Sequence, residues 1–151
     1  MMTEKGLHPN LVFFDLDGTL IKGDSYRLLL KDLFSQGDLK YKLSLLIASA
    51  LRKLRFITHA QFITLSLQPF HGWTREHIFH WGEAFCTKRL TPNILGQARS
   101  TIQSHKEAGR ILALATGSPM IYLNFLARQL GVDHVLGTPL EYSNDIFTGR
   151  L

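Results

Sequence analysis

Residues 11–20 read Leu11-Val12-Phe13-Phe14-Asp15-Leu16-Asp17-Gly18-Thr19-Leu20. The apolar run at the start is too short for a helix and predicts a strand buried on both faces, as in a parallel sheet. Asp15 and Asp17 then point the same way, while Leu16 turns into the core. Two carboxylates at one point favour a bound cation or a shared proton. An Asp-Gly turn after a strand is also a common structural turn, and the residues alone leave both interpretations open.

A second buried-strand pattern, Ile111 to Ala115, ends in Thr116-Gly117. Ser118-Pro119 then predicts a helix cap followed by a first-turn proline, and His134 to Gly137 predicts a third strand. Strands that alternate with helices predict a parallel sheet with right-handed crossovers. Ligands bind beyond the carboxyl ends of such strands, so we expect Asp15 and Thr116 to lie at one site.

The segment between these two strand ends has helical composition and is too long for a single crossover. The fold class that we predict is therefore α/β, a Rossmann-like parallel sheet with an inserted α-helical cap. Residues 1–21 and 89–151 would form the core, and residues 22–88 the cap. The predicted helices cover residues 26–36 after an N-cap at Ser25, about 40–55, about 75–88 after a cap at Thr74, and 91–109, and a hairpin turn follows at 143–145.

Composition excludes several classes of protein. The chain has 151 residues, of which 45% are hydrophobic and 19% charged, so it is one globular domain rather than a disordered segment. Its single cysteine, Cys86, excludes an internal disulfide and a Cys-rich zinc site. The apolar stretch Leu43–Leu51 is far shorter than the roughly 20 residues of a membrane span, and no signal peptide precedes Leu11. We expect a soluble, cytoplasmic protein.

The net charge of +5 arises between Lys22 and Arg55, where eight basic residues face three acidic ones. Such a segment attracts anionic ligands, although a solvated helix face is the alternative interpretation. The helix near residues 40–55 has basic ends and an aliphatic middle, which fits either an anionic membrane surface or an inward-facing cap helix. We favour the inward-facing helix, with one apolar stripe that comprises Leu43, Leu46, Ile47, Ala50 and Leu54.

Two further hypotheses carry less weight. His71, His77 and His80 lie close enough in sequence to hold a metal, but Phe79 and Trp81 indicate a packing face instead. No nucleic-acid-binding module is visible, so we expect no nucleic-acid partner.

The segment Phe14–Leu20 resembles the first motif of the haloacid dehalogenase superfamily of phosphohydrolases. Thr116-Gly117, after the next buried strand, is similar to the second motif of that superfamily. The helical insert resembles the cap of the phosphoserine-phosphatase-like branch, and Phe147–Leu151 resembles a stretch that those proteins carry. The resemblance extends over the whole chain.

The resemblance implies a role for each motif residue. Asp15 would be the nucleophile that forms an aspartyl-phosphate, and Asp17 would be the general acid and base. The Asp15 carboxylate and the Asp17 backbone carbonyl would hold Mg²⁺. The Thr116 hydroxyl and the backbone N–H groups of Gly117 and Gly18 would bind the phosphate.

Asp24 lies where this branch often has an acidic residue that contacts substrate, and an acid at a helix start is an equally good interpretation. The resemblance also implies a lysine and an acidic pair after a later strand. No lysine follows Lys106, and the later acids, Asp133, Glu141 and Asp145, form no such pair. We therefore expect the chain to end before the third and fourth motifs, with an apolar sheet edge that favours self-association.

The resemblance implies a Mg²⁺-dependent phosphatase that hydrolyses a small phosphorylated metabolite. The activity of these 151 residues alone is open, because part of the family's charge balance is absent. A phosphotransferase of the same family is one alternative. A catalytically silent module that binds phosphate and Mg²⁺, or another protein, is the other.

Overall fold

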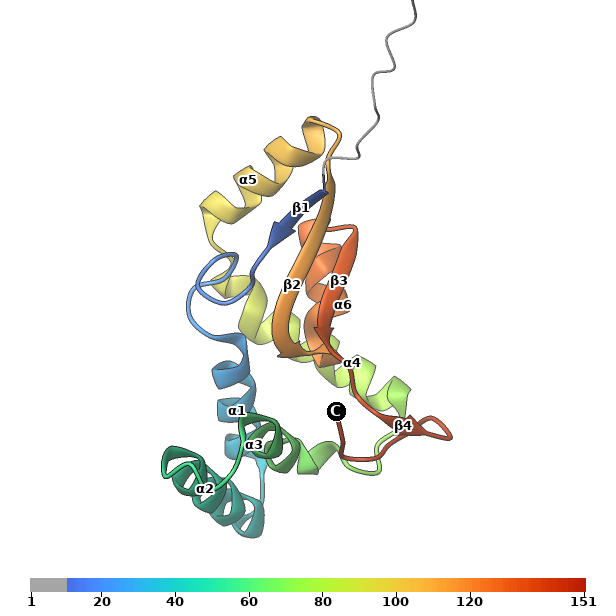
Figure 1. The fold of residues 1–151 in the computed structure, drawn as a ribbon. Coiled ribbons are helices and arrows are strands. Elements are labelled where there is room, and N and C mark those ends of the chain that lie inside the picture. The colour runs from blue at the N-terminus through green and yellow to red at the C-terminus, as the bar shows by residue number, and fades with distance from the viewer. Residues whose placement is uncertain (1–10) are drawn as a thin grey trace, which may run out of the picture.

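The computed structural model describes residues 11–151, which form an α/β fold (Figure 1). Its central sheet has three parallel strands in the order β1, β2, β3. These strands are Leu11–Phe14 (β1), Ile111–Pro119 (β2) and His134–Thr138 (β3). The predicted fold class and the parallel pairing are confirmed. The predicted division into core and cap stays a prediction, and its first ten residues lie outside the described part.

Helices cover the sheet and extend beyond the carboxyl ends of its strands. In Figure 1, α5 lies beside β1, α6 lies behind β3, and α1 to α3 lie below the sheet. The α-helices are Ser25–Gln36 (α1), Leu39–Lys53 (α2), His59–Ser66 (α3), Arg75–Phe85 (α4), Gly96–Glu107 (α5) and Met120–Leu130 (α6). The shorter elements are 3₁₀ turns at Gln68–Phe70 and Thr91–Asn93, a π-helical turn at Cys86–Leu90, and the hairpin strands Tyr142–Ser143 (β4) and Ile146–Phe147 (β5).

The face of β1 that carries Phe14 packs against α5, where the Phe14 and His105 rings meet edge to face at 5.7 Å. The opposite face is open, since Leu11 is 47% and Phe13 57% exposed. The prediction that this strand is buried on both faces is therefore wrong. β1 is the edge of the sheet, and α5 covers one face of it.

Helices α4 and α6 pack closely because α4 carries a glycine at the crossing point. A Cβ atom on Gly82 would lie 1.9 Å from the carbonyl oxygen of Ile121. The Phe85 and Tyr122 rings lie next to this contact, 5.3 Å apart. Any side chain at position 82 would therefore push the two helices apart.

The helix that we predicted over residues 91–109 begins later, at Gly96, after a separate 3₁₀ turn at Thr91–Asn93. Two predicted helix caps are also wrong. Asp24, not Ser25, caps α1, because its Oδ1 accepts a hydrogen bond from the Arg27 N–H at 2.8 Å. Helix α6 begins after Pro119 without a side-chain cap, and Ser118 is buried instead. Both serine hydroxyls take part in a network described below. The cap that we predicted at Thr74 is confirmed by its hydrogen bond from the His77 N–H.

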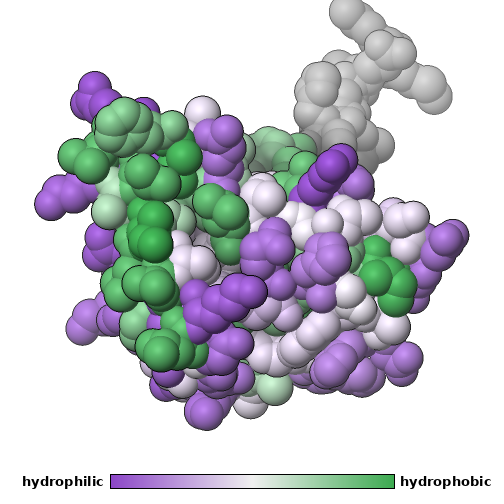
Figure 2. Space-filling view, turned by 90° about the horizontal axis from the view of Figure 1, so that it is seen from below, coloured by the Kyte–Doolittle hydropathy of each residue, from purple (hydrophilic) through white to green (hydrophobic). Residues whose placement is uncertain are grey.

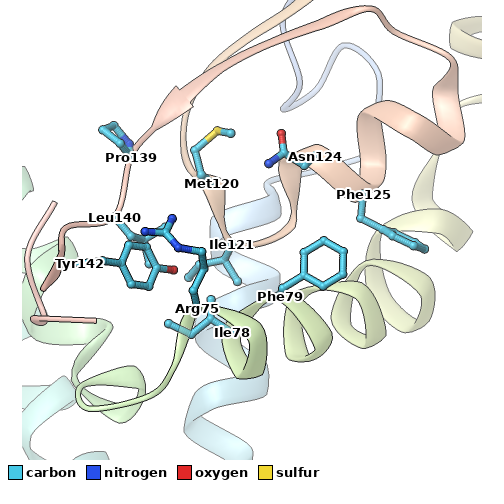
Figure 3. A pocket seen from close by; sticks show the side chains of 10 residues that line it. All are labelled: Arg75, Ile78, Phe79, Met120, Ile121, Asn124, Phe125, Pro139, Leu140 and Tyr142. Carbon is cyan, nitrogen blue, oxygen red and sulfur yellow. The ribbon is translucent and has the colours of Figure 1, made fainter. Parts of the chain in front are cut away.

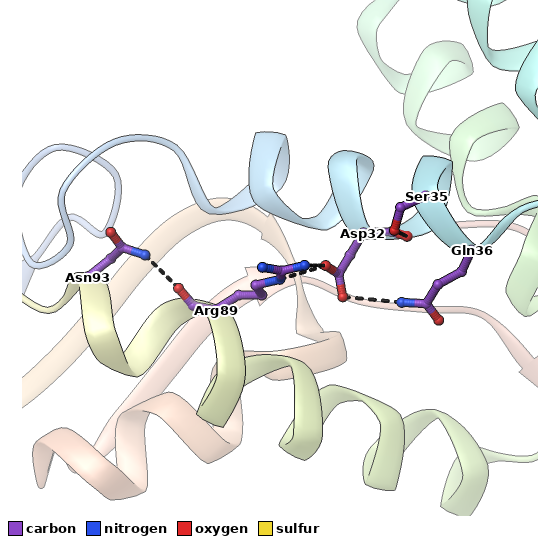
Figure 4. Close-up of polar contacts among 5 residues, drawn as sticks. All are labelled: Asp32, Ser35, Gln36, Arg89 and Asn93. Atoms are coloured by element: carbon purple, nitrogen blue, oxygen red, sulfur yellow. Dashed lines mark hydrogen bonds and ion pairs between the residues drawn. The ribbon is translucent and has the colours of Figure 1, made fainter.

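An ion pair connects α1 with the turn after α4, in which the Asp32 side chain is buried and the Arg89 side chain is 43% exposed (Figure 4). Arg89 Nε donates to Asp32 Oδ1 at 2.6 Å, and Gln36 Nε2 donates to Asp32 Oδ2 at 3.2 Å. Asn93 in turn donates to the Arg89 backbone carbonyl at 2.7 Å. Both oxygens of the buried carboxylate therefore have a partner.

The orientation that we predicted for the helix near residues 40–55 is wrong. Leu45 and Ala48 are the residues that α2 buries, and the predicted inward stripe faces solvent. The helix rests on α3 through its opposite side, where the Tyr41 hydroxyl donates to the Ser66 carbonyl at 2.9 Å. The side of α2 that is buried is therefore the side that faces α3, although the other side carries more apolar residues.

Of the three histidines that we considered as metal ligands, His77 packs on an aromatic ring and His80 lies beside two glutamates. The His77 ring stacks on Trp73 with centroids 4.0 Å apart, and His80 lies 3.8 Å from both Glu76 and Glu83. Residues 11–151 contain no group of three His, Cys, Asp or Glu side chains that could hold a metal. Within the same range, no helix combines the length and hydropathy that crossing a bilayer requires.

Candidate active site

A cavity of about 240 Å³ lies where β1 and β2 end. It brings together five of the six predicted site residues, which come from the two strand ends and the start of α1: Asp15, Asp17, Asp24, Thr116 and Gly117. Tyr26, His59, Ile63 and Ser118 complete the lining. Residues separated by about a hundred positions thus meet at the edge where parallel strands place their ligands.

Asp15 follows the last residue of β1 and is exposed in the cavity. The Thr19 hydroxyl donates a hydrogen bond to Asp15 Oδ2 at 3.3 Å. This contact orients the carboxylate and leaves Asp15 Oδ1 available to a ligand.

Each oxygen of the Asp17 carboxylate accepts one hydrogen bond. The Ser25 N–H donates to Asp17 Oδ1 at 2.7 Å, and the Ser118 hydroxyl donates to Asp17 Oδ2 at 3.4 Å. The hydroxyls of Ser25 and Ser118 lie 2.9 Å apart, and the Tyr122 hydroxyl donates to Ser25 Oγ at 2.9 Å. All three of these residues are buried.

The direction of this network follows from its two ends. Burial raises the pKa of Tyr122, so its hydroxyl stays protonated and donates. An ionised Asp17 can only accept hydrogen bonds. The protons therefore point from Tyr122 through Ser25 and Ser118 to Asp17, and the network holds this carboxylate in one orientation.

Gly18 does not line the cavity. Its backbone N–H, which we predicted to be open to phosphate, donates to the carbonyls of Ile21 at 3.1 Å and Gly23 at 2.9 Å. The positive φ of 75° at Gly18 serves the turn after Asp17. The prediction that this N–H is open is therefore wrong, because it closes the turn, and the phosphate contact of Gly18 stays a prediction.

Thr116 and Gly117 form an irregular end of β2. The register with β3 shifts between Ala115 and Pro119, which frees the backbone there from regular pairing. Thr116 Oγ1 accepts from the Ser118 N–H at 3.2 Å, so its own hydroxyl proton can be donated into the cavity. The Gly117 carbonyl accepts from the Thr138 hydroxyl at 2.7 Å, which holds the turn in place.

Asp24 combines the two interpretations that the sequence left open. It caps α1, and it also lines the cavity. One carboxylate oxygen serves the Arg27 N–H, which leaves the other available to the cavity.

Sequence reasoning missed several residues of the site. Ser118 directly follows Thr116-Gly117, and its position could have indicated a role, but it resembled a helix cap. Tyr26 contacts Ser66 through its hydroxyl, and burial raises its pKa to about 12. His59 opens α3, and no local pattern connects it with Asp15.

A separate cavity of about 300 Å³ lies between α4, α6 and the hairpin of β4 and β5 (Figure 3). At its rim the Arg75 guanidinium lies 3.9 Å from the centre of the Tyr142 ring and is paired with Asp145 at 2.8 Å. The lining is mainly apolar and contains none of the predicted site residues. It is therefore distinct from the site at the strand ends.

The profile of the haloacid dehalogenase-like hydrolases matches residues 12–151, which include both motifs. The chain belongs to this family. A phosphoserine phosphatase of Mycobacterium tuberculosis is 29% identical over 145 residues, which cover 92% of this chain and 47% of that protein. A phosphoglycolate phosphatase of Pasteurella multocida is 28% identical and covers 83% of this chain and 59% of its own length. The chain spans about half the length of the first of these relatives.

Solved structures agree with the fold. A Bordetella pertussis protein of unknown function matches with a TM-score of 0.80 and 25% identity, over 93% of this chain and 66% of that one. A phospho-aspartyl intermediate analogue of phosphoserine phosphatase matches with a TM-score of 0.57 and 18% identity, over 93% of this chain and 61% of that one. These structures share the fold of the chain, and its relatives include a phosphoserine phosphatase.

Proposed function

We propose that this site hydrolyses a small phosphomonoester through an aspartyl-phosphate on Asp15. One observation carries the proposal: Asp15, Asp17 and Thr116 line the same cavity at the strand ends. The names of the relatives, which include phosphoserine phosphatase and phosphoglycolate phosphatase, support a phosphorylated small molecule as substrate.

In the first half-reaction, an Asp15 carboxylate oxygen attacks phosphorus, and the bond between phosphorus and the substrate oxygen breaks. Asp17, in its protonated form, gives its proton to the departing alkoxide. The Thr116 hydroxyl donates to a phosphate oxygen, where negative charge accumulates.

In the second half-reaction, Asp17 takes a proton from water, and the water oxygen attacks phosphorus. The bond from phosphorus to Asp15 breaks, and inorganic phosphate leaves. The serine network keeps the Asp17 carboxylate in place through both steps, because the Ser25 N–H and the Ser118 hydroxyl each hold one of its oxygens.

The donor set of the cavity fits Mg²⁺. Asp15 offers an exposed carboxylate, and the Asp17 backbone carbonyl is a second oxygen donor at the same turn. Magnesium prefers oxygen ligands and is often held by one or two carboxylates, with water and substrate phosphate completing its shell. When bound, it would offset the repulsion between Asp15 and the phosphate.

Hydrolysis of p-nitrophenyl phosphate with Mg²⁺ tests the proposal. We expect Asp15→Asn to lower the rate at least about 10³-fold, because an amide is a poor nucleophile. Asp38→Asn is the matched control, since Asp38 caps α2 outside the cavity and asparagine caps equally well. Hydrolysis that survives Asp15→Asn refutes the proposal.

Two further outcomes separate the alternatives. A phosphotransferase would pass the phosphoryl group to an added alcohol in preference to water, which product analysis detects. A silent binding module would bind a phosphate mimic such as trifluoroberyllate without any hydrolysis by the unsubstituted chain.

A further inference from the structure

The outward side of α2 is apolar and exposed. The side chains that form it, together with the turn that follows, are between 52% and 82% exposed: Leu39, Leu43, Leu46, Ile47, Leu54 and Phe56. We call this set the α2 face. Figure 2, which views the molecule from below, shows a continuous band of hydrophobic side chains on the side where α2 lies in Figure 1.

Helix geometry separates this face cleanly from the protein core. At about 100° per residue, Leu43, Leu46 and Ile47 point away from the direction of Leu45 and Ala48, which are buried. The apolar stripe therefore lies opposite the contact with α3. In an ordinary surface helix the outward side is polar, whereas α2 carries apolar side chains on its outward side as well as on its buried side.

Basic side chains surround the α2 face. From Asp38 to Phe56 the chain carries five basic residues and one acid. On the helix, Lys40 flanks one edge of the stripe, while Lys42 and Lys53 flank the other. Long basic side chains at the edge of an apolar face can reach anionic headgroups while the apolar residues enter the acyl boundary.

We propose that the α2 face docks on the surface of an anionic lipid bilayer, with α2 lying in the plane of the interface. Charge complementarity selects this partner, because a cationic rim is attracted to acidic headgroups by about 1 kcal/mol for each basic residue near the surface. A second copy of the chain is disfavoured, since pairing through this face would bring two cationic rims together. The docking does not depend on the proposed phosphatase activity.

The position of the face relates it to the cavity. Phe56 ends the exposed set, and His59, which begins α3 soon afterwards, lines the cavity. In a docked molecule, α2 would therefore lie between the bilayer and α3, the helix that forms one wall of the cavity.

Sedimentation with lipid vesicles tests the proposal. We expect the chain to bind phosphatidylcholine vesicles that contain about 30% phosphatidylglycerol at least about tenfold more tightly than pure phosphatidylcholine. Raising the salt from about 0.1 M to about 0.5 M weakens this binding, because it screens the headgroup charge. Lys40→Gln/Lys53→Gln lowers both the affinity and its dependence on salt.

The decisive variant is Leu46→Gln/Ile47→Gln, which replaces two exposed side chains and leaves the buried side of α2 unchanged. We expect it to lower vesicle binding by about tenfold or more, with unchanged circular dichroism. Leu136→Gln is the matched control, since Leu136 on β3 is 56% exposed, and it should bind as the unsubstituted chain does.

Several results would overturn the proposal. These are no binding to anionic vesicles, equal binding to neutral ones without salt dependence, or an equal loss in the Leu136→Gln control. Light scattering adds a further one: a dimer that forms without vesicles and is lost in Leu46→Gln/Ile47→Gln would show that a second copy covers the face.

Discussion

The Tyr122 hydroxyl is the buried end of the network that holds Asp17. It donates one hydrogen bond, to Ser25 Oγ at 2.9 Å, and Tyr122 is fully buried. Tyr122→Phe removes this hydroxyl and keeps the ring that packs against Phe85. The substitution therefore isolates one polar contact within an apolar environment.

The expected loss of stability in Tyr122→Phe depends on the hydrogen bonds that Ser25 keeps. Ser25 Oγ keeps its contact with Ser118 at 2.9 Å, so it is not left without a partner. A typical hydrogen bond contributes about 1 kcal/mol to stability. Because Ser25 is buried, water cannot replace the hydrogen bond that its Oγ loses, which adds to the cost. We expect Tyr122→Phe to lower the free energy of unfolding by about 1–2 kcal/mol. For a domain of this size, that corresponds to a fall in Tm of about 2–8 °C.

Urea and thermal unfolding, followed by circular dichroism, measure this cost. Tyr142→Phe is the control, because Tyr142 is only partly buried and lies in the hairpin away from the network. It should change the free energy of unfolding by less than about 0.5 kcal/mol. If Tyr122→Phe is no less stable than this control, the network does not stabilise the fold as argued.

The same variant has a catalytic consequence that rests on the proposed function. With Asp17 less firmly oriented, we expect kcat to fall several-fold while KM changes little, since Tyr122 lies outside the cavity lining. A change in KM alone would contradict a positioning role.

Three further outcomes test packing and charge. Gly82→Ala should lower the free energy of unfolding by about 2 kcal/mol or more, because its Cβ would lie 1.9 Å from a backbone oxygen of α6, whereas Gly96→Ala meets open space and should cost nothing. Arg89→Met should cost about 2–3 kcal/mol, because the buried Asp32 carboxylate loses its cationic partner and keeps only the hydrogen bond from Gln36, and adding Asp32→Asn should recover most of this cost in a double-mutant cycle. Burial raises the pKa of Cys86 to about 12, so the native thiol should resist alkylation at pH 8. Since an unfolded thiol ionises near pH 8.5, stability should fall as pH rises above about 9, and less so in Cys86→Ala.

Local patterns were sufficient to predict the strands and their alternation with helices. The apolar run before Asp15 and the run before Thr116 each coincide with a strand, and the hairpin turn at residues 143–145 is confirmed between β4 and β5. Exposure was less predictable. The outer face of β1 and the stripe of α2 are apolar but uncovered, because hydrophobicity indicates what benefits from burial and not what lies next to it.

For the candidate site too, one part could be predicted from local patterns and another could not. The residues of the two motifs meet because the carboxyl ends of neighbouring parallel strands converge, which sequence order already implies. The contacts from α1, α3 and α6 could not be predicted, since they depend on how the helices pack. Ser25 and Ser118 show the difference: each resembled a helix cap, and each is instead buried beside Asp17.

The close contact between α4 and α6 at Gly82 bears on how far each wall of the cavity can move. The wall at Thr116 precedes α6, and another wall belongs to α3. Helix α6 starts soon after Thr116, at Met120. The backbone of α4 is in direct contact with the first turn of α6, at Gly82 and Ile121. A shift of the turn at Thr116 away from Asp15 would therefore require α6 and α4 to move as well. On the opposite wall, His59 and Ile63 belong to a short helix backed mainly by α2. Widening of the entrance for a bulkier ligand is therefore easiest on the α3 side.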